Sequence, residues 1–204
     1  MFAFYKPPAF SGDYFSVGYQ HAKWWINYLN QPGNEDYKRY YNSFLQSSWK
    51  AKFTPLLDNT SAFSPQIIEE ISGMHQALKD EGIKTSFENT FAACLGETDD
   101  KSSQCTSFAS IYNEAIYLGH NEERDEVCPL CIAKVTIKSD KPKEFVAASY
   151  PFQLFGSAFG GFNKHIAFQS NSIGCFKSTK KIESSWAERI PKTIFTRIFL
   201  KLTA

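Results

Sequence analysis

The chain has 204 residues, of which 43% are hydrophobic and 21% are charged, a composition typical of one globular domain or of a two-lobed one. Its 22 basic and 21 acidic residues leave a formal net charge of +1, so charge gives no reason to expect binding to nucleic acid or to a membrane surface. No apolar run is long enough for a membrane-spanning helix.

The cysteine content and the first residues bear on the cellular compartment. Five cysteines form an odd and sparse set, which suits a reducing compartment better than a disulfide framework. The first eight residues lack the charged and apolar regions of a cleavable secretory signal. We therefore expect a cytoplasmic protein.

Before residue 104 the apolar periodicity is helical. Ser16 is the expected N-cap of a first helix, and one face of that helix carries Val17, His21, Trp24, Trp25 and Tyr28. An aromatic segment over 37–49 predicts a second helix, and 87–95 predicts a short later one.

The clearest helix is the one that begins at Pro65. Ser64 precedes the proline as a cap, and Pro is favoured in the first turn of a helix. An apolar stripe follows, made of Ile67, Ile68, Ile71, Met74 and Leu78. We interpret His21 as a hydrogen-bonded core residue and expect His75 to face solvent beside this stripe.

Residues 97–104 are polar without apolar periodicity and are typical of an exposed loop. After that loop the pattern changes to short β-rich segments separated by turn residues. The expected strands are 105–111, 115–119, 128–137, 144–148 and 165–170. Residues 155–162 are rich in glycine and predict a loop with close backbone contacts, and 190–202 show helical spacing.

Cys105 is the residue with the most chemical interest. It follows the polar loop, begins the first expected strand, and is followed by Thr106 and Ser107. A second polar run, Leu118–Glu123, comes within one strand's length. The pairing predicts a thiol nucleophile with polar partners on a returning antiparallel strand.

An ordered set of short motifs along essentially the whole chain resembles the acyl-coenzyme A:6-aminopenicillanate acyltransferase family of N-terminal nucleophile hydrolases. That family also includes carcinine hydrolases and N-β-alanyl-dopamine hydrolases. The motifs are Gly12–His21, Pro65 with Glu69, Glu70 and Gly73, Cys105–Phe108, Gly119–Glu122, Pro151, Gly156, Asn163, Asn171 with Ser172, and Ile190-Pro191 with Arg197.

The resemblance implies a fold and a domain organisation. The expected fold is α+β, the first part of an αββα sandwich of the N-terminal nucleophile type. Residues 1–104 would form a helical pro-segment, and 105–204 the incomplete N-terminal part of the catalytic domain. The two pieces would stay associated after cleavage, and a homo-oligomer is left open.

The resemblance also implies an activity. A cut between Gln104 and Cys105 would free the α-amino group of Cys105, whose pKa near ~8 suits a general base at neutral pH. The enzyme would be a cysteine-nucleophile amidohydrolase or acyltransferase acting on a small amide or acyl thioester, with no cofactor expected.

Three further residues receive roles from the resemblance. Asn121 and Glu123 would orient the amine and thiol of Cys105, and Asn171 would lie near the developing oxyanion. Relatives usually have Asp at the position of Glu123 and commonly Gly at that of Gln104, and Ala22 and His165 stand where relatives often have Gly. Simple alternatives are a solvated turn carboxylate for Glu123 and a turn-capping amide for Asn171.

Two rival functions stay open. The family's late Thr-Asn-His-like motif is absent, so the chain is expected to be a fragment without hydrolase activity of its own, or a divergent non-catalytic member acting as a structural or binding module. The pair Cys128 and Cys131 gives a weaker zinc or redox hypothesis, since structural zinc needs four ligands and no second Cys/His pair has suitable spacing.

Overall fold

The structure of the protein is a computed structural model that describes residues 7–50, 53–95, 105–122, 129–158, 160–164, 166–169 and 192–200. These residues form a mixed fold of six helices and two sheets. The expected combination of helices and strands is therefore confirmed. Of the helices in the described ranges, none has the length and apolar character that a membrane crossing requires.

The first helix, α1 (Tyr14–Leu29), begins earlier than expected because another residue caps it. Asp13 has extended backbone, and its Oδ1 accepts a hydrogen bond from the Ser16 backbone N–H at 2.7 Å. This is the ordinary N-cap geometry, so the prediction of Ser16 as the cap was wrong. Val17, His21 and Trp25 are fully buried, as the apolar face predicted.

The next four helices complete the helical layer. They are α2 (Glu35–Ser47), α3 (Thr54–Phe63), α4 (Pro65–Asp80) and α5 (Phe87–Leu95). The start of α4 at Pro65 and the bounds of α5 are confirmed. Helix α3 was not predicted, because its run TPLLDNTSAF contains only a weak apolar pattern.

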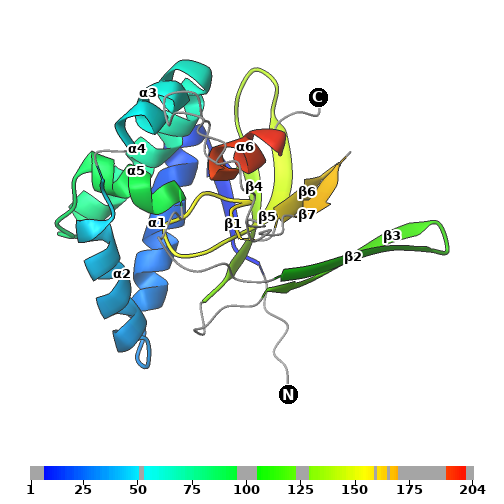
Figure 1. The fold of residues 1–204 in the computed structure, drawn as a ribbon, viewed down its shortest axis with the longest axis horizontal. Helices are drawn as coiled ribbons and strands as arrows, with labels where there is room; N and C mark the ends of the chain where they lie inside the picture. The colour runs from blue at the N-terminus through cyan, green and yellow to red at the C-terminus, as the bar shows by residue number, and fades with distance from the viewer. Residues whose placement is uncertain are drawn as a thin grey trace, which may run out of the picture.

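A five-stranded sheet lies against these helices. Its order is β1-β4-β5-β6-β7, with β1 parallel to β4 and the other pairs antiparallel (Figure 1). The strands are β1 (Ala9–Gly12), β4 (Cys131–Ile137), β5 (Lys143–Ser149), β6 (Gly160–Asn163) and β7 (Ala167–Gln169). Strand β1 was missed, so the first 104 residues contribute to the sheet as well as to the helices.

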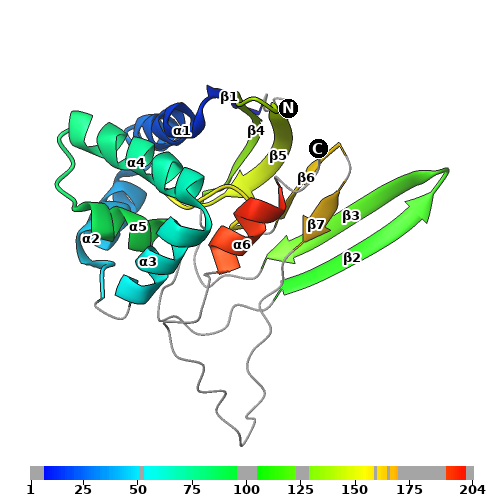
Figure 2. The same ribbon diagram turned by 90° about the horizontal axis from the view of Figure 1, so that it is seen from above.

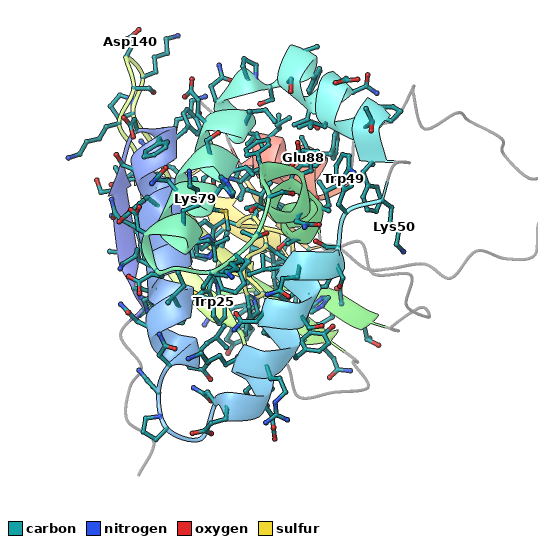
Figure 3. All side chains as sticks on the ribbon, turned by 90° about the vertical axis from the view of Figure 1, so that its left-hand side faces the viewer. Trp25, Trp49, Lys50, Lys79, Glu88 and Asp140 are labelled. Atoms are coloured by element: carbon teal, nitrogen blue, oxygen red, sulfur yellow. The ribbon has the colours of Figure 1, made fainter. Side chains whose placement is uncertain are left out.

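The helices cover one face of this sheet, as two perpendicular views show (Figures 1 and 2). Burial alternates along β4, where Cys131, Ala133, Val135 and Ile137 are fully buried and the residues between them are more exposed. One core cluster joins residues of the helices to residues of β1, β4 and β5. In Figure 3 Trp25 lies near the centre of these packed side chains, and Asp140 lies at the periphery.

Two glycines in β6 allow its neighbours to approach closely. A Cβ at Gly160 would lie 2.1 Å from the Phe168 carbonyl oxygen, and one at Gly161 would lie 2.6 Å from that of Val146. The expected close backbone contact in 155–162 is thus present, although part of this segment is a strand and not a loop. The last helix, α6 (Lys192–Phe199), contacts α5.

The second sheet is a hairpin of β2 (Cys105–Tyr112) and β3 (Ala115–Glu122), which extends away from the helices (Figures 1 and 2). Asn113 and Glu114 form its two-residue turn with φ values of 48° and 62°. Positive φ at both turn positions is the type I′ geometry that matches the twist of a tight hairpin.

Candidate active site

The predicted nucleophile lies at the first position of β2. The register pairs Cys105 with Glu122, Thr106 with Asn121 and Ser107 with His120. The prediction that the strand beginning at Cys105 pairs with an antiparallel strand ending in the polar run is therefore confirmed.

The register also assigns the polar residues to faces. Directly opposed residues lie on the same face of a hairpin, and successive residues lie on opposite faces. Positions 105, 107, 120 and 122 therefore share one face. Asn121 lies on the other face, where it is exposed opposite Thr106.

One hydrogen bond joins the two strands on the face of position 105. Ser107 Oγ lies 2.8 Å from His120 Nδ1. Both side chains are half-buried, whereas Ile111 and Ile116 near the turn are 77% and 70% exposed. Ser107 and His120 are thus more protected than the side chains near the turn.

The rest of the predicted constellation lies outside the described residues. These positions are Gln104 at the expected cut, Glu123 and Asn171. Of the predicted site residues, the structure therefore relates only Cys105 and Asn121, on adjacent strands and on different faces.

A second polar group lies in the core between α1 and β5. His21 Nε2 is 2.9 Å from Ser149 Oγ and accepts a hydrogen bond from Trp25 Nε1 at 3.0 Å. The Phe155 ring stacks on the imidazole with 3.9 Å between centroids. Burial, and secondarily the charge of Arg197, lowers the pKa of His21 to about 3. His21 is therefore a neutral hydrogen-bonded core residue, as predicted.

His75 differs from the prediction. Its Nδ1 lies 3.1 Å from Thr90 Oγ1 on α5, and its ring meets Phe87 edge-on. Partial burial lowers its pKa. The expectation of a solvent-facing side chain was wrong because α5 packs beside α4 and supplies this hydroxyl.

A buried ion pair joins α4 to α6. Arg197 Nη2 lies 2.8 Å from Glu70 Oε2, its Nε donates to the same carboxylate, and both side chains are fully buried. The guanidinium also lies over the Phe145 ring, 4.5 Å from its centroid. This fork geometry pairs two charges that are held out of water, and Arg197 Nη1 is buried without a hydrogen-bond partner among the described residues.

The cysteines apart from Cys105 divide into two groups. Burial raises the pKa of Cys131 to about 12 and that of Cys94 well above its ordinary value. Both thiols are therefore protonated near neutral pH and have little nucleophilic character. Cys128, the other half of the proposed metal pair, and Cys175 lie outside the described residues, which contain no group of three potential metal ligands.

Comparisons with family models, with curated proteins and with solved structures find no match for this chain.

Sequence reasoning did not single out two of these arrangements. The Ser107–His120 pair could have been found by counting, because a two-residue turn at 113–114 fixes every opposed pair along the hairpin. The Glu70–Arg197 pair could not, because its partners are 127 positions apart and meet only through the packing of α6.

Proposed function

We propose that this chain is part of a cysteine-nucleophile amidohydrolase or acyltransferase of the N-terminal nucleophile class, made as a precursor and cut between Gln104 and Cys105. The observation that carries the proposal is the position of Cys105. It begins β2, directly after the segment expected to be cut, and the polar end of β3 lies across from it.

The contacts of the motif residues support the family resemblance. A Cβ at Gly18 would lie 1.8 Å from the Glu70 carbonyl oxygen, and one at Gly73 would lie 2.0 Å from that of Phe15. Glu70 also holds Arg197. Residues from three separate motifs thus make the contacts that hold α1, α4 and α6 together. A shared structural role in packing these helices would explain why these residue types occur at these positions.

The finer fold belongs to the same proposal. The described sheet has helices on one face (Figure 2), which corresponds to one helix layer and one sheet layer of an αββα sandwich. The hairpin would belong to the second sheet layer.

The proposed chemistry uses the two functional groups of one residue. After the cut, the α-amine of Cys105 takes the proton of its own thiol, and the sulfur attacks the carbonyl of a small amide or acyl thioester. The resulting acyl-enzyme passes its acyl group to water or to an amine. Glu123 is proposed to orient the amine and thiol, and Asn171 to stabilise the oxyanion. Asn121 lies on the other face of the hairpin from position 105 and does not fit the orienting role.

Self-cleavage provides the test. Intact-mass measurement of the purified chain should find two pieces, 1–104 and 105–204, and Cys105→Ala should give one uncut mass. Iodoacetamide should label Cys105 faster than Cys94 and Cys131, whose thiol pKa values are raised. Cys131→Ala, as the matched control, should still be cut.

The alternative is a non-catalytic structural or binding module. The exposed apolar side chains of the hairpin favour it, among them Ile111 at 77% and Tyr112 at 66% exposure. An uncut chain whose Cys105 resists iodoacetamide would favour this alternative over the enzyme.

A further inference from the structure

The proposed base cannot act in the first reaction of the precursor. Until the bond between Gln104 and Cys105 is broken, the nitrogen of Cys105 is an amide, which has no basic lone pair to accept the thiol proton. The uncut chain therefore needs a different proton acceptor. An imidazole can fill this role, because it exchanges protons near neutral pH.

The hairpin provides an imidazole on the required face. His120 shares the face of position 105, two residues along β3 from the position directly opposite Cys105. Diagonal neighbours of this kind have Cα atoms ~7–8 Å apart, which long side chains can span. Glu122, directly opposite Cys105, is the other titratable residue on this part of the face.

Ser107 restrains the histidine ring. Its Oγ contacts His120 Nδ1 at 2.8 Å, and either tautomer is compatible with that contact. In the tautomer with the proton on Nδ1, the ring donates to Ser107 and carries its basic lone pair on Nε2. The hydroxyl would then fix the orientation of the base.

The other described histidines are poorly placed for this role. His21 is buried on α1 with both Trp25 and Ser149 at its Nε2, and its pKa is lowered to about 3. His75 lies on α4 and contacts Thr90. Of the histidines in the described ranges, His120 alone belongs to the hairpin.

We propose that His120, oriented by Ser107, is the general base and acid of the self-cleavage step. This inference rests on the proposed function. The imidazole takes the thiol proton of Cys105, and the sulfur attacks the Gln104 carbonyl carbon. The carbon–nitrogen bond then breaks as the imidazolium returns the proton to the departing nitrogen. Water hydrolyses the resulting thioester to the Gln104 carboxylate and the free Cys105 thiol.

The test follows cleavage of the full chain over time by intact mass. His120→Ala should slow cleavage by ~10²-fold or more, the range for loss of a general base. Ser107→Ala should slow it less, and Ser107→Thr should restore it because it keeps the hydroxyl. The matched controls Ser110→Ala, on the other hairpin face, and His75→Gln should be cleaved at the wild-type rate.

Free imidazole separates a chemical role from a structural one. Added imidazole should speed the cleavage of His120→Ala, because it can occupy the space of the lost ring and take the proton. Circular dichroism should show that the variant is folded, and His120→Gln serves as a second variant if it is not. Slow cleavage of a folded variant without rescue would mean that His120 acts only in folding, which would overturn the inference.

The remaining outcomes separate the two proposals. Wild-type and His120→Ala chains that cleave at equal rates would overturn the role of His120 and leave the proposed function standing. A wild-type chain that neither cleaves nor reacts at Cys105 would overturn the proposed function, and the present inference with it.

Discussion

Individual residues in the core of this protein carry polar groups whose charge state depends on burial. His21 is the clearest case, because its ring is fully buried between Phe155 and the hydroxyl of Ser149. A buried imidazole must stay neutral unless a partner stabilises its charge, and the nearby guanidinium of Arg197 opposes that charge further. In mildly acidic solution the His21 imidazole therefore stays neutral in the native state, whereas it binds a proton in the unfolded chain.

This exclusion predicts a pH-dependent stability. The pKa of His21 is lowered to about 3 in the fold, against an ordinary 6.5, so the unfolded state binds the extra proton between these values. The contribution of neutral His21 to the free energy of unfolding is fully present above pH ~6.5. As the pH falls below that value, the free energy of unfolding decreases by ~1.4 kcal/mol per pH unit for one proton. Urea unfolding at several pH values between 4 and 6 gives the slope of the free energy of unfolding against pH. For His21→Gln this slope should be smaller than for the wild type by about this amount.

His75→Gln is the matched control for that experiment. Its ring is only half-buried and also has a lowered pKa, so its removal should flatten the pH dependence less. An unchanged slope in His21→Gln would show that the buried imidazole does not determine this part of the acid sensitivity.

At the scale of elements, the packing of α1 on α4 depends on two glycines that face the backbone of the other helix. Gly18 lies against the carbonyl of Glu70, and Gly73 lies against that of Phe15. Both glycines belong to the motifs that carry the family resemblance. The reason for glycine is steric, because helices at this distance leave no room for a Cβ.

Gly73→Ala should therefore destabilise the protein although alanine favours helix. The new Cβ would lie 2.0 Å from the Phe15 carbonyl oxygen, so the helices must move apart, at a cost of ~1–3 kcal/mol or more. Chemical denaturation measures the loss. Ser72→Ala, one position earlier, should stay near wild type, since it removes only a local hydroxyl contact to the Ile68 carbonyl.

At the scale of the whole molecule, the segment before residue 104 and the segment after it share one core. Strand β1 pairs with β4 along four residues, Arg197 of α6 holds Glu70 of α4, and the core cluster includes side chains of both segments. The expected cleavage site therefore lies between two parts of one folded unit.

We predict that the two pieces stay together after the chain is cut. A specific protease site introduced between residues 98 and 103 would produce the cut independently of Cys105. The cut protein should elute from a sizing column at the volume of the intact chain, and should separate only in denaturant. Separate elution under native conditions would show that the shared core does not hold the pieces.

Local patterns in the sequence determined much of the secondary structure. Pro65 and the apolar periodicity determine the start of α4, although Ser64 makes no side-chain capping hydrogen bond. Local patterns also determine the extent of α5 and the hairpin, because helix and strand repeats depend on near neighbours. The two-residue turn at 113–114 also determines which residues of β2 and β3 oppose one another. The position of Cys105 at the head of its strand follows from these local rules.

Other features were decided only by tertiary structure. Four residues of β1 carry too short a pattern to be recognised, and pairing with β4 makes them a strand. The partners of Glu70 and His75 lie on α6 and α5, which come later in the chain. A local sequence pattern does not specify which side chains of two separate helices will meet. Long-range packing also determines that His21 is neutral in the core, since burial lowers its pKa.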